Sequence, residues 1–122
     1  MDWEELGLWG QLILARTSAR PYQPPTDIYE TETEFVILVA VSRASEIKVR
    51  YSGGTIIVTG VRREPEPEVP KRYHLMEIYT GPFERRIVIN ADIEPEGIRS
   101  TYRDGLLEIR VPKRKPIDIE IE

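Results

Sequence analysis

The sequence predicts an all-β fold, a β-sandwich built from short strands. From residue 27 onward, apolar and polar residues alternate in short runs, which is typical of strands with one buried face. Glycine, proline and other turn-forming residues separate these runs at the spacing found in sandwiches. With 122 residues, of which 40% are hydrophobic, the chain is long enough for one domain with its own core.

The first 24 residues differ from the rest, and we expect them to form a separate N-terminal arm. Asp2 can cap a short helix over residues 2–16, although Gly7 and Gly10 weaken it. The large apolar side chains of this arm are Trp3, Leu6, Leu8, Trp9, Leu12, Ile13 and Leu14. The proline-rich segment 20–25 interrupts the helical pattern and marks the boundary of the arm.

The strands that follow are justified by their alternation. We expect strands over 27–30, 34–41, 46–51, 55–63, 83–90, 97–102 and 106–111, and a segment of mixed character over 71–79. The strand 34–41 is apolar on both faces, so it should lie centrally between two layers. In the others one face is apolar, as with Ile47, Val49 and Tyr51.

The connections also have recognisable chemistry. Ser52-Gly53-Gly54 and Arg103-Asp104-Gly105 predict hairpin turns. Segment 64–70 holds three prolines and three glutamates, so we expect an exposed loop. Gly81-Pro82 breaks the chain, 91–96 reads as a polar connection, and Pro112 is expected to end strand pairing.

The last six residues alternate isoleucine with carboxylate, as Ile-Asp-Ile-Glu-Ile-Glu. Such a strand has one apolar face and cannot bury its isoleucines against itself. It needs a groove, either on its own domain as an added strand or on another copy of the chain. The second arrangement would be a device for assembly, so the tail favours an oligomer over an enzyme.

Composition excludes several classes of function. There are no cysteines and only one histidine, His74, so we expect no disulfide, no cofactor, no metal site and no thiol catalysis. A net charge of −4 argues against nucleic acid as a partner, and no apolar run is long enough to span a membrane. No nucleotide-binding or hydrolase motif is present, so an enzyme is not expected. Without a recognisable signal peptide, a cytoplasmic location is expected, and the ten prolines would suit a thermophile.

Several motifs, in order, resemble the α-crystallin domain of small heat shock proteins. The segment from Ile98 to Lys113 resembles the family signature, an Asp-Gly turn followed by alternating apolar residues and Pro-Lys. Residues 25–30, 56–62 and 81–85 resemble an opening strand, a central strand and a Gly-x-Phe-x-Arg turn, and the tail resembles the I-x-I anchor. The sequence departs at Ser100, where alanine is usual, and at residues 41–46, which lack the usual Pro-Gly step.

The resemblance implies an immunoglobulin-like β-sandwich over residues 25–113, preceded by an arm (1–24) and followed by a tail (114–122). It implies an ATP-independent holdase, an archaeal or other thermophilic type, that binds unfolded client proteins and assembles from strand-swapped dimers. A CS-domain co-chaperone or adaptor, which shares the sandwich, is the alternative. Such proteins lack the tail motif, so the tail favours the holdase.

The resemblance also implies roles for particular residues. Ile117, Ile119 and Ile121 would be the anchor, seated in a groove lined by Ile47, Val49, Ile98 and Ser100, which could instead pack in the core. A strand formed by Arg72, Tyr73, His74, Leu75 and Met76 would be exchanged between protomers, or else belong to a disordered surface loop. The arm residues Trp3, Leu6, Leu8, Trp9, Leu12 and Ile13 would contact clients, or dock as a helix on their own domain.

Overall fold

The structure is a computed structural model that describes residues 21–116 and 119–121, so the helix expected over 2–16 lies outside the described residues. The elements are β1 (Thr26–Glu30), β2 (Glu34–Ala40), β3 (Ala44–Ser52), β4 (Thr55–Arg62), β5 (Gly81–Val88), the 3₁₀ turn η1 (Pro95–Gly97), β6 (Arg99–Arg103) and β7 (Leu106–Pro112). Every strand expected from alternation is present, and no strand end differs from its expected position by more than two residues. Residues 71–79, the segment of mixed character, form no strand.

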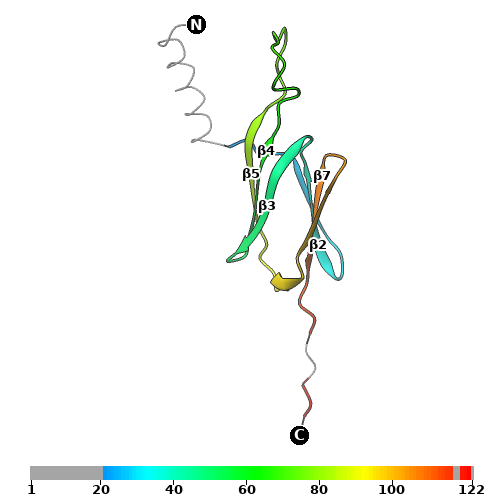
Figure 1. The fold of residues 1–122 in the computed structure, drawn as a ribbon. Coiled ribbons are helices and arrows are strands. Elements are labelled where there is room, and N and C mark those ends of the chain that lie inside the picture. The colour runs from blue at the N-terminus through cyan, green and yellow to red at the C-terminus, as the bar shows by residue number, and fades with distance from the viewer. Residues whose placement is uncertain (1–20, 117–118, 122) are drawn as a thin grey trace.

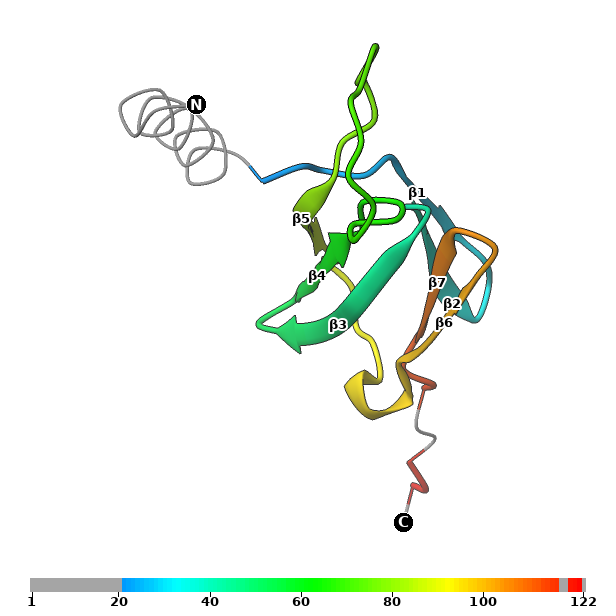
Figure 2. The same ribbon diagram turned by 45° about the horizontal axis from the view of Figure 1, so that its top comes forward.

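The strands form two antiparallel sheets that pack face to face, which confirms the predicted sandwich (Figures 1 and 2). One sheet has the order β1-β2-β7-β6 and the other the order β3-β4-β5. Each sheet therefore ends in two edge strands, β1 and β6 in the first and β3 and β5 in the second. Because backbone groups along an edge are only half paired, these four strands are where another chain can add.

The core fills the space between the sheets with aliphatic side chains and one aromatic ring. Its fully buried members include Ile37 and Val39 of β2, Ile56 and Val58 of β4, and Phe83 of β5. Strand β2 is central in its sheet, since it pairs with both β1 and β7, but within the described residues only one of its faces packs against the other sheet, so the expected position between two layers is not seen. Val36 is buried as well, yet it stands opposite Arg110 on the other face of the sheet and does not belong to this core.

Two expectations about the connections need correction. Residues 91–96 are not simply a polar connection, because Ile93 is buried in the core and bridges to Lys113. Pro112 does not end pairing, since it is opposite Glu34 in β7 and the bridge at Lys113 follows it. The Pro112 carbonyl accepts a hydrogen bond from the Glu94 amide at 2.9 Å, so this position contributes an acceptor and does not need the amide hydrogen that proline lacks.

The predicted hairpin turn between β3 and β4 is present, and its backbone explains its sequence. Gly53 and Gly54 both have positive φ angles, 56° and 81°. Two consecutive residues in this region are the requirement of the tight hairpin turn that matches strand twist, and glycine meets it without strain. The turn brings β3 and β4 into register from Ser52–Thr55 onward.

A close approach at Gly60 gives a stability prediction. A Cβ atom at Gly60 would lie 2.5 Å from the Cζ atom of the buried Phe83 ring on the neighbouring strand. We expect Gly60→Ala to lower the free energy of unfolding by about 1–3 kcal/mol, because the buried ring or the strand must shift to make room for the added methyl group. Urea unfolding would measure the loss, and adding Phe83→Leu should recover part of it. Equal stability of Gly60→Ala and the parent chain would contradict this packing.

The connection between β4 and β5, residues 64–79, projects from one end of the sandwich as a narrow protrusion (Figure 1). Lys71 holds its two sides together by donating hydrogen bonds to the carbonyls of Pro65 and Glu66 at 2.8 and 2.5 Å. The Tyr73 hydroxyl donates to Glu64 at 3.3 Å. The loop was expected to be exposed, and it is.

Candidate functional site

The tail leaves the sandwich at the end opposite the protruding loop (Figure 1). Its last backbone hydrogen bonds to the domain are from the Lys113 amide to Thr33 and from the Arg114 amide to Asp92. Beyond this point, Ile119 and Ile121 are 84% and 98% exposed and belong to no strand. Ile117 lies outside the described residues. The two described isoleucines are therefore not covered by residues 21–116.

The residues expected to line a groove lie on two neighbouring edges, β3 and β6. Ile47, Val49 and Ile98 are half-buried and pack against the core, while Ser100 is exposed. By register, Val49 and Ser100 point to the inner side of their sheets, opposite Val58 and Ile109. We call the inward-facing residues of these edges the β3–β6 seam; its members are Ile47, Val49, Tyr51, Ile98, Ser100 and Tyr102.

Tyr102 joins the two edges at one end of the seam. Its hydroxyl accepts a hydrogen bond from the Ala44 amide at 3.1 Å and donates one to the Val41 carbonyl at 2.7 Å. Sequence reasoning missed this tyrosine and Tyr51 as members of the seam. The period-two alternation from Ile47 and Ile98 would have found both, because residues two apart share a face.

A bulge at the start of β3 interrupts its pairing with β4. The register between β3 and β4 shifts between Ser45 and Lys48, and Glu46 has a φ angle of 54°. Ile47 and Val49 are two residues apart and share a face by ordinary strand alternation, and both pack against the core. The departure of residues 41–46 from the family pattern therefore leaves the seam in place.

The segment expected to be exchanged, Arg72 to Met76, forms no strand in the single chain, and all five residues are exposed. Leu75, Met76 and the following Ile78 are 75%, 57% and 68% exposed, which is unusual for side chains of this size. His74 is exposed with them. The segment thus presents apolar side chains and unpaired backbone away from the body of the sandwich.

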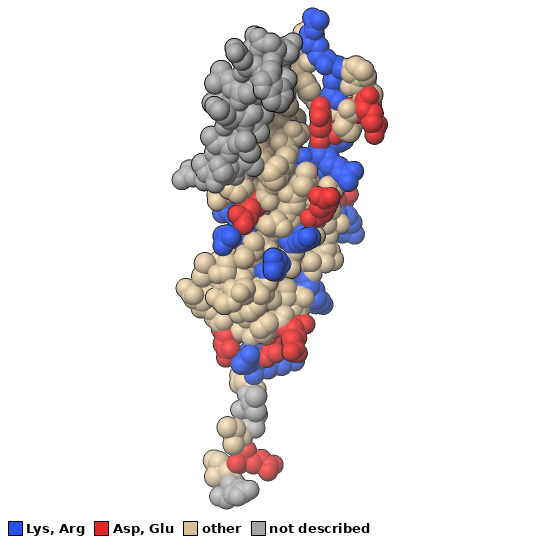
Figure 3. Space-filling view, turned by 60° about the vertical axis from the view of Figure 1, so that its left-hand side comes forward, with Lys and Arg blue, Asp and Glu red and all other residues tan. Residues whose placement is uncertain are grey.

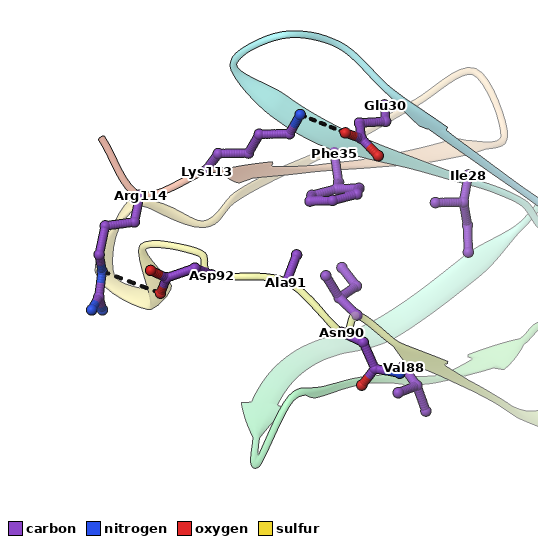
Figure 4. A pocket seen from close by; sticks show the side chains of 10 residues that line it. Ile28, Glu30, Phe35, Val88, Asn90, Ala91, Asp92, Lys113 and Arg114 are labelled. Carbon is purple, nitrogen blue, oxygen red and sulfur yellow. Dashed lines mark hydrogen bonds and ion pairs between the residues drawn. The ribbon is translucent and has the colours of Figure 1, made fainter. Parts of the chain in front are cut away.

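A hollow of about 470 Å³ lies on the side of the sandwich opposite the seam, between β1 and the end of β5 (Figure 4). Ile28 and Val88 are exposed at its margins. Its two cations are already paired, Lys113 with Glu30 at 2.6 Å and Arg114 with Asp92 at 3.6 Å. The hollow therefore suits apolar contact better than capture of a free anion.

Arg85 is unusual among the residues of β5. It lies between Phe83 and Ile87 on the core side of the strand, opposite Val58. Its Nε atom is buried and has no hydrogen-bond partner in the part of the chain that the structure describes. A buried donor of this kind is unfavourable unless another group accepts from it, so residues 21–116 and 119–121 leave this hydrogen-bond donor unsatisfied.

The junction with the N-terminal arm is held to β5. Tyr22 bridges in parallel to Phe83, and its carbonyl accepts a hydrogen bond from the Glu84 amide at 3.0 Å. Its ring stacks on Tyr79, with 4.6 Å between ring centres. The arm residues expected to contact clients, Trp3 to Ile13, lie outside the described residues.

Charged groups on the solvent face of the four-stranded sheet form a network. Arg110 lies between Glu34 and Glu108, with Arg99 at 3.8 Å from Glu34. Hydrogen bonds to Glu34 and then Glu108 raise the pKa of the Arg110 guanidinium. Figure 3 shows another face, on which basic and acidic groups are interspersed, with both signs also at the end from which the tail leaves.

Residues 21–116 and 119–121 contain no cluster of histidine, aspartate or glutamate able to hold a metal ion. Within the same residues, no helix has the length and apolarity needed to cross a membrane. What the described part of the chain does offer is edges and exposed apolar side chains. The arrangement is therefore suited to binding other polypeptides.

Comparison with known proteins agrees with this geometry. The Hsp20/alpha crystallin family matches residues 27–122. Small heat shock protein C2 of Rickettsia felis is 30% identical over 94 residues, which cover 75% of this chain and 61% of that protein. A probable 15 kDa heat shock protein of Leptospira interrogans is 28% identical over 101 residues, covering 81% of this chain and 76% of the relative.

A solved structure shares the fold. The hspA protein from Xanthomonas axonopodis superposes with a TM-score of 0.67 and 31% identity, covering 76% of this chain and 95% of that one. The chain spans about three fifths of the length of the two Rickettsia felis small heat shock proteins that it matches.

Proposed function

Because the chain belongs to the Hsp20/alpha-crystallin family, we propose that it is an ATP-independent molecular chaperone, a holdase that works as an oligomer built from dimers. The family consists of chaperones rather than enzymes. The matches give no support to the co-chaperone alternative. A cytoplasmic location stays a prediction.

The mechanism we propose is mass action. A partly unfolded protein exposes apolar surface, and a chaperone that binds this surface lowers the concentration free to aggregate. No step in this scheme consumes ATP. Assembly covers the same kind of surface while clients are absent, so dissociation of the oligomer would make binding sites available.

The observation that carries the proposal is the uncovered apolar surface at both ends of the sandwich. The tail presents Ile119 and Ile121 at one end, and the protruding loop presents Leu75 and Ile78 at the other. Exposed apolar side chains gathered in this way usually mark a contact with another polypeptide. A protein with this surface is suited to self-association and to binding of unfolded chains.

We propose that the tail of one chain docks on the β3–β6 seam of another. Isoleucines two apart share a face, so Ile117 with Ile119, or Ile119 with Ile121, can enter the seam together. Burying two isoleucines stabilises the contact by roughly 3–6 kcal/mol before ordering costs, which suits an exchangeable contact. The half-buried state of Ile47, Val49 and Ile98 supports this assignment.

We propose that the dimer forms by exchange of residues 71–76, which would add to a sheet edge of the partner. The exposure of all five residues Arg72 to Met76 and the apolar side chains of Leu75 and Met76 among them support an intermolecular role. The arm residues Trp3 to Ile13 are the proposed contacts for clients. Residues 1–24, 25–113 and 114–122 would then be arm, sandwich and anchor.

A turbidity assay tests the holdase proposal. We expect the chain to suppress aggregation of two unrelated heated proteins, in proportion to its ratio to client, because recognition depends only on exposed apolar surface. Addition of ATP should change nothing. Absence of protection at equal mass, with and without ATP, would contradict the proposal, and protection of only one client would favour an adaptor.

A further inference from the structure

We propose that the β3–β6 seam selects acidic tails, because a rim of cations borders it on both sides. This rests on the proposed docking of the tail, and it adds a second, electrostatic component to the contact. The rim consists of Lys48 and Arg50 on β3 and Arg99 and Arg103 on β6. The occupant is the C-terminal tail of a second copy of this chain.

The tail supplies the complementary charge by its alternation. In an extended segment, successive side chains point to opposite sides, so Asp118, Glu120 and Glu122 point away from whatever surface receives the isoleucines. With isoleucines directed into the seam, the carboxylates stand at its mouth. Cations on the two edge strands could then reach them.

The cations of β3 are placed where they can meet the carboxylates of a docked tail. Lys48 and Arg50 alternate with the seam residues Ile47, Val49 and Tyr51, and both are exposed. Their registers opposite Thr59 and Ile57 put them on the outer face of the sheet at its edge. Neither has an ion pair within residues 21–116 and 119–121, so both are available to a partner.

The cations of β6 are engaged only weakly. Arg99 is 3.8 Å from Glu34, which already pairs with Arg110. Arg103 is 4.0 Å from its neighbour Asp104, and both side chains are about nine-tenths exposed. Long contacts at such exposed positions contribute little, so these guanidinium groups can turn to a docked carboxylate without a large loss.

The rim is locally basic in a chain that is acidic overall. Residues 47–52 and 98–103 hold four cations and no carboxylate, while the whole chain has a net charge of −4. In sequence, Glu46, Glu96 and Asp104 flank these two segments, and Glu108 on the strand next to β6 stands opposite Thr101, where it already pairs with Arg110. Complementary charge of this kind raises the association rate and disfavours wrong partners. An apolar tail without carboxylates, or with lysines in their place, would dock less well.

A charge reversal with a matched control tests the rim. Arg50 and Arg86 stand in one row of the three-stranded sheet, on either side of Ile57 and on the same face. Only Arg50 borders the seam. We expect Arg50→Glu to raise the protein concentration at half-assembly by about tenfold, from one lost attraction and one new repulsion. Arg86→Glu, with the same change in net charge, should shift it less than about twofold.

Rescue and salt complete the test, with mass measured by light scattering on the full chain. The double variants Lys48→Glu/Arg50→Glu and Asp118→Lys/Glu120→Lys should each weaken assembly, and their combination should restore it. Raising salt from roughly 0.05 to 0.5 M should weaken the parent assembly in the same direction. Far-UV circular dichroism of each variant should match the parent chain.

The outcomes separate this inference from the proposed function. The proposed role of the rim would be wrong if Arg50→Glu and Arg86→Glu shifted the concentration at half-assembly equally. It would also be wrong if the combined charge-reversal variant did not regain the parent's assembly. If the charge variants give either of these results but Ile119→Ala/Ile121→Ala still dissociates the oligomer, the tail binds the seam through apolar contacts alone. If the isoleucine variant is also silent, docking of the tail on the seam is wrong, and the rim with it.

Discussion

Replacement of both Ile119 and Ile121 by alanine should reduce the assembly to dimers. The change removes most of the side-chain surface that two pockets would bury, roughly 2–5 kcal/mol for each tail contact. A closed assembly depends on many equivalent contacts, so the loss should be cooperative in its effect on mass. Light scattering at several concentrations measures it directly.

The fold of each subunit should not change in this variant. Both isoleucines follow the end of β7 and are almost fully exposed, so no packing in the sandwich depends on them. Far-UV circular dichroism and the urea midpoint should equal those of the parent chain. Full oligomer mass in the double variant, or loss of its fold, would contradict the role of the tail.

Single substitutions identify the pair that docks. If Ile117 and Ile119 enter the seam, Ile121→Ala should be almost silent and Ile117→Ala should weaken assembly. The opposite pattern would assign Ile119 and Ile121. Ile119 belongs to either pair, so Ile119→Ala serves as the positive control in both cases.

Most strands could be predicted from sequence because their apolar residues alternate against a single core. Strand β4 shows this most clearly, since Ile56 and Val58 point to the core while Ile57 and Thr59 point outward. Strand β2 departs from alternation, and its apolar character on both faces indicated a central position. The reason emerges only from the structure, in which Val36 is buried on the outer face opposite Arg110.

Features that depend on tertiary contacts were not predictable. Ile93 lies in a polar stretch with no periodicity, and its burial follows from the path of the chain after β5. The contact of Gly60 with Phe83 requires the pairing of β4 with β5, which no local pattern specifies. The ion pairs of Lys113 and Arg114 with Glu30 and Asp92 likewise join segments far apart in sequence.

For the site, the resemblance indicated residues that the structure brings to two neighbouring edges. Ile47, Val49, Ile98 and Ser100 lie on or beside β3 and β6, although the two strands belong to different sheets. The contribution of Tyr102 was missed because its hydrogen bonds go to backbone groups about sixty residues earlier. The proposed role of these residues in assembly involves a second chain. Variants that change the mass of the oligomer are therefore its direct test.

Deletion of residues 64–79, with a short glycine-rich turn in their place, should convert the dimer to a folded monomer. Arg62 at the end of β4 pairs with Gly81 at the start of β5, so the two strands are already adjacent where the loop leaves them. A tight turn can therefore close the hairpin without moving either strand. The deletion removes the whole segment proposed for exchange, and sedimentation or light scattering should give the mass of one chain.

Two further variants separate exchange of the segment from damage to the domain. Because Tyr79 stacks on Tyr22, a shorter deletion of residues 64–78 keeps this contact and should give a monomer of higher stability. Replacing Leu75, Met76 and Ile78 with serine leaves the loop length unchanged and should weaken the dimer, because these exposed side chains lose their apolar contact with the partner. A folded deletion variant that remains dimeric would exclude exchange of residues 71–76. The dimer contact would then have to lie on another sheet edge. The first edge to test would be β1, with the hollow between β1 and the end of β5.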